Sequence, residues 1–464
     1  MNTLIAITGL GVLCLLFEIL NFRKAIIPAM IIGLLAVLGM SISDLNVLMN
    51  GGTVYNDPAY FNMIVVSKFS AAFSALFIVL GIFLITLAHD FYANHPTKIS
   101  DFISIKIFML AGAVAMVSFG NLAMFFLGIE ILSISLYILA ASDRLSIKSN
   151  EAGMKYFLMG SFASGILLFG ICLIYGAMGT FDVAEITDWS RSAELPVWFP
   201  IGISLVTIGM LFKIAAVPFH FWAPDVYEGS PTLTTATMST LVKVVAMATL
   251  YKLLATMNAD ISAAFINIII VISIASMTIG NIMALQQNNL KRMLAFSGIS
   301  HAGFMLMTLL TISTSAGSLL YYTVAYSLAG IAAFTVILYV CKNKDNEDIS
   351  NFNGLGKNNP LMAVILASAL LSMAGIPIFA GFFAKLFLFN QVIDAGYLVV
   401  VIAAVLNSII SVGYYFKLIL AMFNKEPNEA VQKTPVVFYI VAVVAIILNI
   451  AIGLFPSTVL DLLG

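Results

Sequence analysis

The chain of 464 residues is 61% hydrophobic and only 9% charged, with a formal net charge of -1. A soluble domain carries roughly 25% charged residues, so most of this surface must face lipid or protein rather than water. A net charge near zero offers no basic patch for nucleic acid, which we exclude as a partner. Because the sequence has no Cys-x-x-Cys, G-x-G-x-x-G or Walker A pattern, it predicts no iron–sulfur, zinc or nucleotide site.

Apolar segments of roughly 20 residues, the length that crosses a bilayer, recur along the chain. The first has no basic residues before it, so we interpret it as a retained span rather than a cleaved signal. Only Gly120 and Asn121 separate the fourth from the fifth. We predict an all-α integral membrane protein with about fourteen spans, near residues 3–20, 25–43, 66–88, 104–119, 121–141, 154–178, 197–222, 233–255, 262–284, 292–312, 318–341, 361–391, 396–423 and 436–456.

Basic residues alternate between the loops. Three of them, Lys68, Arg191 and Lys252, follow even-numbered spans. Loops rich in lysine and arginine stay on the cytoplasmic side, so we expect both termini, and the acidic loop 182–194, on the periplasmic side. Fifteen follow odd-numbered spans: Arg23, Lys24, Lys98, Lys106, Arg144, Lys148, Lys155, Lys291, Arg292, Lys342, Lys344, Lys357, Lys417, Lys425 and Lys433.

Four charged residues remain inside apolar spans: Glu130, Lys213, Lys243 and Lys385. A lysine at mid-membrane costs about 2.5–3.5 kcal/mol, so each must face a partner or a water-filled cavity. Buried ionisable groups of this kind can carry protons if each of them can both bind and release a proton. A Glu130–Lys213 ion pair would hold the lysine charged, and separation of the pair would let it release its proton. The alternative is that such a lysine is a structural pin to helix-end carbonyls.

Two of these spans contain interruptions. The seventh reads LFKIAAVPFHFWAPD, with Pro218 after Lys213, and the twelfth reads LLSMAGIPIFAGFFAKLFLF, with Gly375 and Pro377 before Lys385. As one helix, the twelfth apolar run of about 31 residues would extend roughly 46 Å, which exceeds the membrane thickness. We predict a broken helix in both places, although a plain proline kink is the alternative.

The two breaks lie five spans apart, which suggests two five-helix repeats at 101–258 and 259–425. Helices 1–3 (1–100) precede them and one C-terminal helix (426–464) follows. Since five is odd, the second repeat must be inverted in the membrane, a pattern typical of transporters.

Other polar residues extend the candidate site. His301, in FSGISHAGFMLM, has a side chain that ordinarily titrates near pH 6.5 and so suits proton transfer, with a structural histidine as the alternative. His220 follows Pro218 and is either a relay group or an interfacial residue. Asp225 and Glu228 are expected at the outer mouth of the seventh span, where they mark a proton exit or, as we favour, cap the eighth helix.

The stretches LFKIAAVPFHFWAPDVYEGSPT, KRMLAFSGISHAGFML and AGIPIFAGFFAKLF resemble the antiporter-like membrane subunits of respiratory complex I, over about residues 100–425. The chain is most similar to the N-type subunits of the bacterial NADH:quinone oxidoreductase. It lacks the long lateral helix of the L-type subunit, and Lys385 stands where the M-type has a glutamate.

The resemblance implies roles for the buried residues. Glu130 pairs with Lys213, Lys243 is the connecting lysine, Lys385 leads the proton outward, and His301 is a polar link in the central axis. It also implies no cofactor in this chain. NADH, FMN, the iron–sulfur clusters and quinone would belong to partner subunits of complex I, in the bacterial cell inner membrane.

Two alternatives share these features. One is a subunit of a multisubunit sodium–proton antiporter, and the other is a membrane subunit of a related hydrogenase or dehydrogenase. A third reading is a structural or assembly subunit without an ion pathway of its own.

Overall fold

A computed structural model describes residues 2–54, 62–92, 98–192, 195–257, 263–342, 344–427 and 434–463. The regular elements in these ranges are helices, joined by three isolated β-bridges. Twelve helices of the described part are long and apolar enough to cross a membrane. Two shorter apolar helices, Trp198–Ile214 and Pro360–Ala374, lie where the seventh and twelfth spans are predicted. The prediction of an all-α integral membrane protein is confirmed.

The helices follow one another in four groups. The first contains α1 (Asn2–Ile19), η1 (Arg23–Ala25), α2 (Ile26–Met49) and α3 (Lys68–Phe91). The second contains α4 (Ile99–Ser118), α5 (Leu122–Ala140), α6 (Ile147–Met178), α7 (Val183–Ser192), α8 (Trp198–Ile214), α9 (Trp222–Gly229), α10 (Thr232–Thr237), η3 (Met238–Val242) and α11 (Lys243–Thr256). The third contains α12 (Ala263–Leu285), α13 (Leu290–Leu306), η4 (Met307–Thr311), α14 (Ala316–Val340), η5 (Ile349–Phe352), α15 (Leu355–Asn358), α16 (Pro360–Ala374), α17 (Ala380–Asp394) and α18 (Leu398–Asn424). The last contains α19 (Val436–Leu454) and α20 (Ser457–Leu460).

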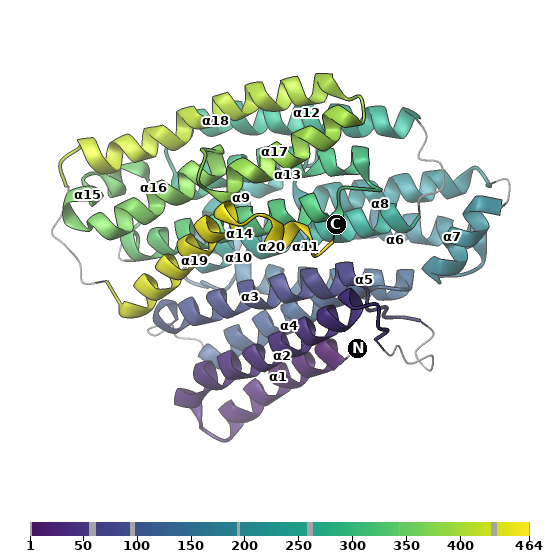
Figure 1. Cartoon of the computed structure of the whole chain (residues 1–464). Coiled ribbons are helices and arrows are strands. Elements are labelled where there is room, and N and C mark those ends of the chain that lie inside the picture. The colour runs from purple at the N-terminus through teal and green to yellow at the C-terminus, as the bar shows by residue number, and fades with distance from the viewer. Residues whose placement is uncertain are drawn as a thin grey trace.

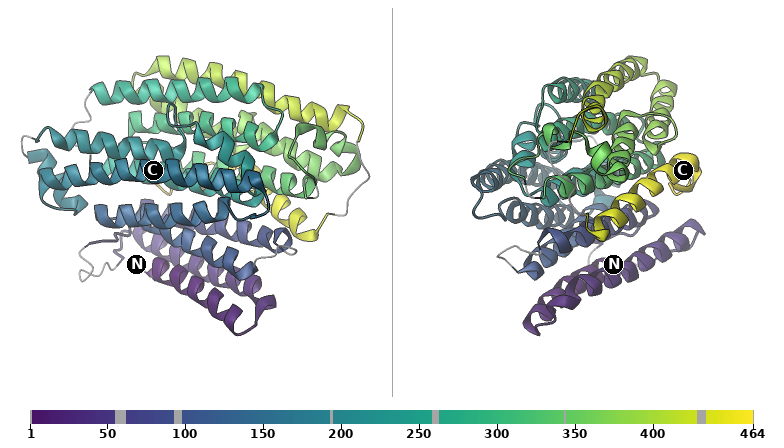
Figure 2. Two further views of the ribbon diagram at one scale, coloured as in Figure 1. Left: turned by 180° about the vertical axis from the view of Figure 1, so that it is seen from behind. Right: turned by 90° about the vertical axis from the view of Figure 1, so that its left-hand side faces the viewer.

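The helices pack side by side, with α1 and α2 at one edge of the molecule and α12 and α18 at the opposite edge (Figures 1 and 2). The central helices α13 and α14 are buried along their apolar length. Large apolar side chains are exposed on the edge helices, for example Ile32 on α2 and Val399 on α18. Such surfaces suit contact with lipid or with other membrane proteins.

The narrow division between α4 and α5 has a local cause. Asn121 has an extended backbone, and its side-chain oxygen accepts a hydrogen bond from the amide of Ala123 at 2.8 Å. Asparagine is a favoured N-cap because it satisfies one of the free amides at a helix start. This cap separates the two spans and sets the depth of Glu130 within α5.

Both predicted helix breaks are confirmed. Helix α8 ends at Ile214, and the next residue, Ala215, is left-handed with φ 58°. Helix α16 ends at Ala374, and Gly375 follows with φ 89°. A left-handed residue directly after the last helical residue turns the chain away from the helix axis. Each broken span therefore presents helix-end carbonyls inside the bundle to side chains: Phe212 accepts a hydrogen bond from Trp222 Nε1, and Ala374 accepts one from Lys385 Nζ.

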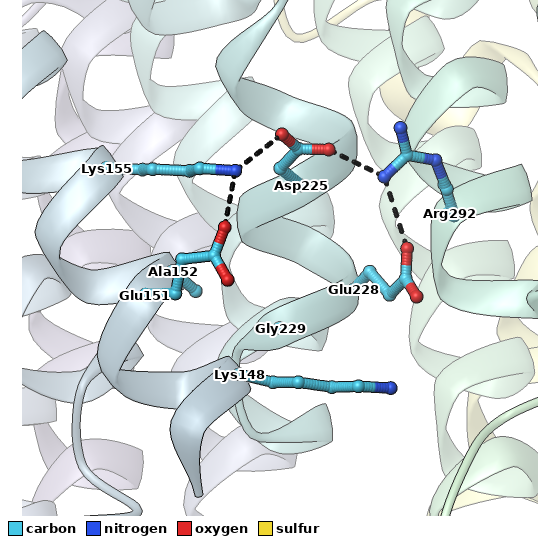
Figure 3. Close-up of a pocket in the computed structure, with 8 residues that line it drawn as sticks. All are labelled: Lys148, Glu151, Ala152, Lys155, Asp225, Glu228, Gly229 and Arg292. Atoms are coloured by element: carbon cyan, nitrogen blue, oxygen red, sulfur yellow. Dashed lines mark hydrogen bonds and ion pairs between the residues drawn. The ribbon is translucent and has the colours of Figure 1, made fainter.

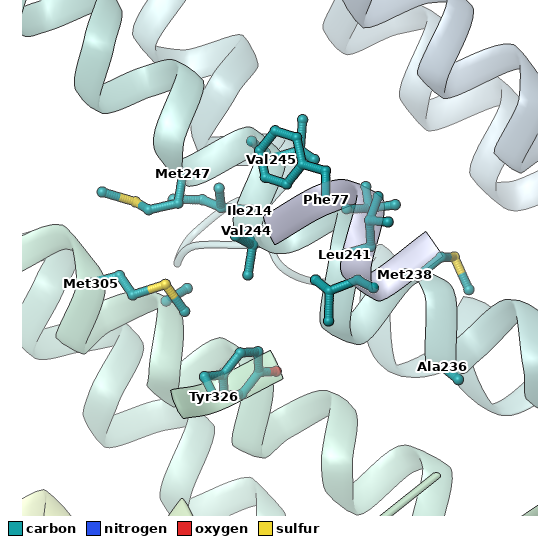
Figure 4. Packing of buried hydrophobic residues seen from close by; sticks show 14 of the residues in the cluster. Phe77, Ile214, Ala236, Met238, Leu241, Val244, Val245, Met247, Met305 and Tyr326 are labelled. Atoms are coloured by element: carbon teal, nitrogen blue, oxygen red, sulfur yellow. The ribbon is translucent and has the colours of Figure 1, made fainter. Parts of the chain in front are cut away.

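The eighth span contains a feature that the sequence does not predict. Its middle segment η3 is π-helical and lies directly before Lys243. The side chain of Leu241 in this segment belongs to a buried apolar cluster that also contains Phe77 and Met305 (Figure 4). Short π-helical segments are frequent at functional sites, because they disturb the regular hydrogen-bond pattern.

Two helix pairs cross closely through glycine. A Cβ added to Gly128 of α5 would lie 2.9 Å from the amide nitrogen of Met116 in α4. A Cβ added to Gly303 of α13 would lie 2.8 Å from the amide nitrogen of Met277 in α12. The two crossings therefore use the same pair of residue types at the same kind of contact.

Candidate functional site

Lys213 lies in the last turn of α8, directly before the first helix break, and is 7% exposed. Its ammonium nitrogen Nζ donates hydrogen bonds to Ser133 Oγ of α5 at 2.7 Å and to Ser164 Oγ of α6 at 3.4 Å. It also lies 5.9 Å from the centre of the Tyr137 ring. The buried ammonium group is thus held by hydroxyl groups from two neighbouring helices.

Glu130 lies on α5, one turn before Ser133, but it is not within ion-pairing distance of Lys213. One of its carboxylate oxygens, Oε1, is buried without a hydrogen-bond partner. The carboxylate remains near enough to act on Lys213 electrostatically. The structure therefore holds this pair in the separated arrangement rather than in the ion-paired one.

Lys243 is the first residue of α11 and is 2% exposed. Its Nζ atom has no hydrogen-bond partner in the structure. A Cβ added to Gly298 of α13 would lie 2.7 Å from this nitrogen and 3.2 Å from the hydroxyl of Tyr326 in α14. The missing side chain at Gly298 leaves the space that the ammonium group and the phenol occupy.

His301 of α13 is buried in a polar cluster. Its Nδ1 lies 2.8 Å from the hydroxyl of Tyr322, and its Nε2 lies 3.3 Å from the hydroxyl of Tyr415. Tyr415 and Ser297 share a hydrogen bond of 2.5 Å. The rings of His301 and Tyr326 are 4.8 Å apart. Side chains from α13, α14 and α18 thus supply several groups that can both donate and accept protons.

Lys385 lies in α17 after the second break and is 6% exposed. Its Nζ donates a hydrogen bond to the carbonyl of Ala374, the last residue of α16, at 2.9 Å. This contact is of the kind expected for a structural pin. The same side chain also lines a cavity of about 10 Å³ with His301, Tyr322 and Tyr326. That volume is near the minimum for one water molecule.

The structure therefore brings Lys243, His301 and Lys385 together around Tyr326, while Lys213 and Glu130 form a second group. No hydrogen bond or ion pair joins the two groups, all of whose members are described. His220 is buried, and its Nδ1 has no partner. It contacts none of the other five predicted site residues through a hydrogen bond or an ion pair.

Asp225 and Glu228 belong to an ion-pair network at the surface (Figure 3). Asp225 pairs with Lys155 at 3.0 Å and with Arg292 at 2.7 Å, and Arg292 also pairs with Glu228 at 3.2 Å. Partial burial raises the pKa of Asp225, but the hydrogen bonds from Arg292 and Lys155 outweigh it and hold that pKa below its usual range. The network links α6, α9 and α13.

This network corrects two expectations. Asp225 and Glu228 pair with Lys155 and Arg292, residues that the loop count assigns to the basic side, so by that assignment they do not lie at the outer mouth. Neither residue caps the eighth helix, because the N-cap of α10 is Pro231 and no side chain caps it. Asp225 and Glu228 pair with basic residues of neighbouring helices instead of capping a helix, and the linear sequence does not reveal which helices are neighbours.

The position of Lys106 also differs from the expected one. The sequence predicts it in a loop on the basic side, but it lies within a helix. Helix α4 begins at Ile99, so Lys106 lies two turns inside it and is 2% exposed. The acidic residue Asp101 in the first turn is the sequence signal that could have placed this helix start correctly. Three residues used in the predictions cannot be placed in this way. Lys433, from the count of basic residues, and Glu194, from the acidic loop, lie outside the described residues, as does the side chain of Arg191.

The described residues contain no group of three or more His, Cys, Asp or Glu placed to hold a metal ion. Cys14 is buried, Cys172 is exposed and Cys341 is intermediate, and all three are free. The predicted site residues inside the bundle are lysines, histidines and one glutamate, with tyrosines beside them, and side chains of these types can transfer protons.

Comparison with known proteins places the chain in a family. The model of the NADH:quinone oxidoreductase/Mrp antiporter transmembrane family matches residues 120–411. The NADH-quinone oxidoreductase subunit N of Flavobacterium johnsoniae is 73% identical over 100% of both chains. A chain of respiratory complex I from Thermus thermophilus is 29% identical with a TM-score of 0.84, covering 99% of this chain and 98% of that one.

A chain of the Mrp complex from Dietzia sp. DQ12-45-1b has a TM-score of 0.90 at 21% identity, covering 99% of this chain and 95% of that chain, which shows a shared fold. The fold is therefore shared with a chain of the Mrp complex, whereas the relative that is 73% identical over the full length is an NADH-quinone oxidoreductase subunit N. The chain belongs to the antiporter-like membrane subunits of NADH:quinone oxidoreductase, and within them to the N type.

Proposed function

We propose that this chain is a proton-translocating membrane subunit of a bacterial NADH:quinone oxidoreductase. Its partners are the other subunits of complex I, including further antiporter-like ones, in the cell inner membrane. NADH, FMN, the iron–sulfur clusters and quinone belong to those partners. A charge that crosses the membrane costs about 2.3 kcal/mol per 100 mV, so the partners must supply the energy.

We further propose that protons move along an axis of Glu130, Lys213, Lys243 and Lys385, with His301 and His220 as additional relay groups. The observation that carries this proposal is that Tyr326, His301 and Lys385 line one cavity of one-water size, while the Nζ of Lys243 lies beside the Tyr326 hydroxyl. Lysine, imidazole and phenol in mutual reach form a chain of groups that can each release and accept a proton.

In the first half of the axis, the separated Glu130 and Lys213 support a switching step. Lys213 is bound to the neutral hydroxyl groups of Ser133 and Ser164, which stabilise a charged ammonium less than a carboxylate does. Approach of the Glu130 carboxylate would hold the proton on Lys213, and its withdrawal would favour release toward Lys243.

The two five-helix repeats remain part of the proposal, with residues 101–258 and 259–425 as their limits. Matched helix breaks after Ile214 and Ala374 and matched glycine crossings at Gly128 and Gly303 support them. The excess of basic residues on one side supports a periplasmic position for both termini.

Substitution of Lys213 or Lys243 by Ala in the intact complex tests the function. We expect proton pumping in proteoliposomes to fall while the complex assembles normally, whereas Lys68→Ala, at an exposed helix start, leaves pumping unchanged. Normal pumping in assembled Lys213→Ala and Lys243→Ala complexes would show that this chain has a structural role.

The sodium–proton antiporter is the competing function, because the fold is shared with the Mrp complex. The site disfavours it, since sodium prefers carboxylate and carbonyl oxygens and the central cluster presents two lysines instead. Purification of the native complex discriminates between them: NADH dehydrogenase activity should copurify with this chain. Its absence, together with sodium-dependent proton movement, would favour antiport.

A further inference from the structure

Two further buried lysines lie outside the proposed axis: Lys291, which pairs with Glu347, and Lys106. Lys106 is 2% exposed in α4, and its Nζ donates one hydrogen bond, to Thr237 Oγ1 of α10 at 3.1 Å. No carboxylate lies within ion-pairing distance of it among the described residues. An ammonium group has three N–H donors, so a charged Lys106 would leave most of them unsatisfied in an apolar environment.

Lys252 shows what a structural lysine looks like in this fold. Its Nζ donates to the carbonyls of Val117 at 2.9 Å and Phe119 at 2.8 Å, which lie at the C-terminal end of α4. Those carbonyls accept hydrogen bonds from the ammonium at a helix C-terminus, where the helix dipole favours a positive charge. Lys106 has no carbonyl partner of this kind, so its environment tolerates a neutral amine better than a fixed charge.

The position of Thr237 connects Lys106 to the proposed axis. Thr237 is the last residue of α10, the π-helical segment η3 follows, and Lys243 begins α11. The two buried lysines therefore meet the two ends of one π-helical segment. A change in the hydrogen bonding of η3 would move both contacts at once.

Hydroxyl side chains line the stretch formed by α10 and the start of η3, from Thr232 to Ser239. At its surface end, Thr232 donates to the carboxylate of Glu347 at 2.9 Å. At its inner end, Ser239 lies 3.3 Å from the hydroxyl of Tyr326, which adjoins Lys243. Hydroxyl groups both donate and accept hydrogen bonds and so can pass a proton on. The intervening buried hydroxyl residues are Thr234, Thr235 and Thr237.

We propose that Lys106 is a further proton-carrying residue on the uptake side, which exchanges protons with the hydroxyl groups of α10 and η3 on the way to Lys243. In each cycle the ammonium releases one proton, becomes a neutral amine and is protonated again from the basic side, without any redox change. This inference rests on the proposed function and adds a residue from the fourth span to it.

Two permanent charge states test the proposal. Lys106→Met is always neutral, and Lys106→Arg is always charged because arginine does not deprotonate in proteins. A positioned proton-transfer group contributes roughly 10²- to 10⁴-fold to its step, so both variants should lose pumping to the level of Lys243→Met. Lys98→Met and Lys98→Arg are the controls, since this lysine precedes the same helix and is exposed.

The measurement is the initial rate of proton uptake by proteoliposomes of the assembled complex, followed as a function of pH. Wild-type pumping in Lys106→Arg would show that Lys106 is a fixed charge and would overturn the inference. Thr237→Val keeps the lysine and removes its partner, so it should displace the pH profile, and an unchanged profile would contradict the pathway. If Lys243→Met also pumps normally, the proposed function itself fails; if only the Lys106 variants pump normally, the inference alone fails.

Discussion

Gly381 is the position where the smallest change should disturb the second helix break most. A Cβ added there would lie 1.8 Å from the carbonyl oxygen of Ser372 and 2.7 Å from its carbonyl carbon. Both atoms belong to the backbone, so no rotamer change can relieve the contact. In Gly381→Ala, helix α17 must therefore move away from α16.

The expected cost has two parts. Overpacking of a tight contact costs about 1–3 kcal/mol. The displacement of α17 also lengthens the 2.9 Å hydrogen bond from Lys385 to Ala374, and a bond to a charged group contributes about 1.5–3 kcal/mol. Together these give a loss of about 2.5–6 kcal/mol of local stability if the overpacking cost and the loss of the bond both apply in full.

The assay compares Gly381→Ala with Gly165→Ala, in which the added Cβ meets nothing within 4 Å. We expect a lower thermal midpoint of the purified complex and slower proton pumping for Gly381→Ala only. If both variants keep the wild-type midpoint and pumping rate, the close approach of α16 and α17 does not position Lys385, and the reasoning is wrong.

Two further predictions concern hydrogen bonds to charged groups. Ser133→Ala removes the nearer partner of Lys213, worth about 1.5–3 kcal/mol, and should slow pumping in proteoliposomes, whereas Ser161→Ala on the exposed face of α6 should not. Asp225 has a pKa below its usual range, so its ion pairs stabilise the fold above the unfolded pKa and this contribution is lost as pH falls through the folded pKa. Asp225→Asn should therefore lower the thermal midpoint near pH 7 and by less in acid; an equal effect at both pH values would contradict the assigned ion pairs.

The sequence alone determined the all-α membrane architecture of this chain and singled out the residues proposed for its site. Apolar runs of membrane-spanning length have one stable solution in lipid, the helix, because every backbone group must be satisfied within the span. A charge within such an apolar run is costly, so it must face a partner or a water-filled cavity. This cost singled out Glu130, Lys213, Lys243 and Lys385. The breaks after Ile214 and Ala374 followed from proline and glycine chemistry.

The tertiary structure decided which of these residues meet. The separation of Glu130 from Lys213, the tyrosines around His301, and the pairing of Asp225 with Arg292 join residues that are distant in sequence. The π-helical segment before Lys243 and the depth of Lys106 also depend on packing and on a helix start. Contacts across a bundle depend on how helices rotate and shift against one another, and composition and periodicity leave both undetermined.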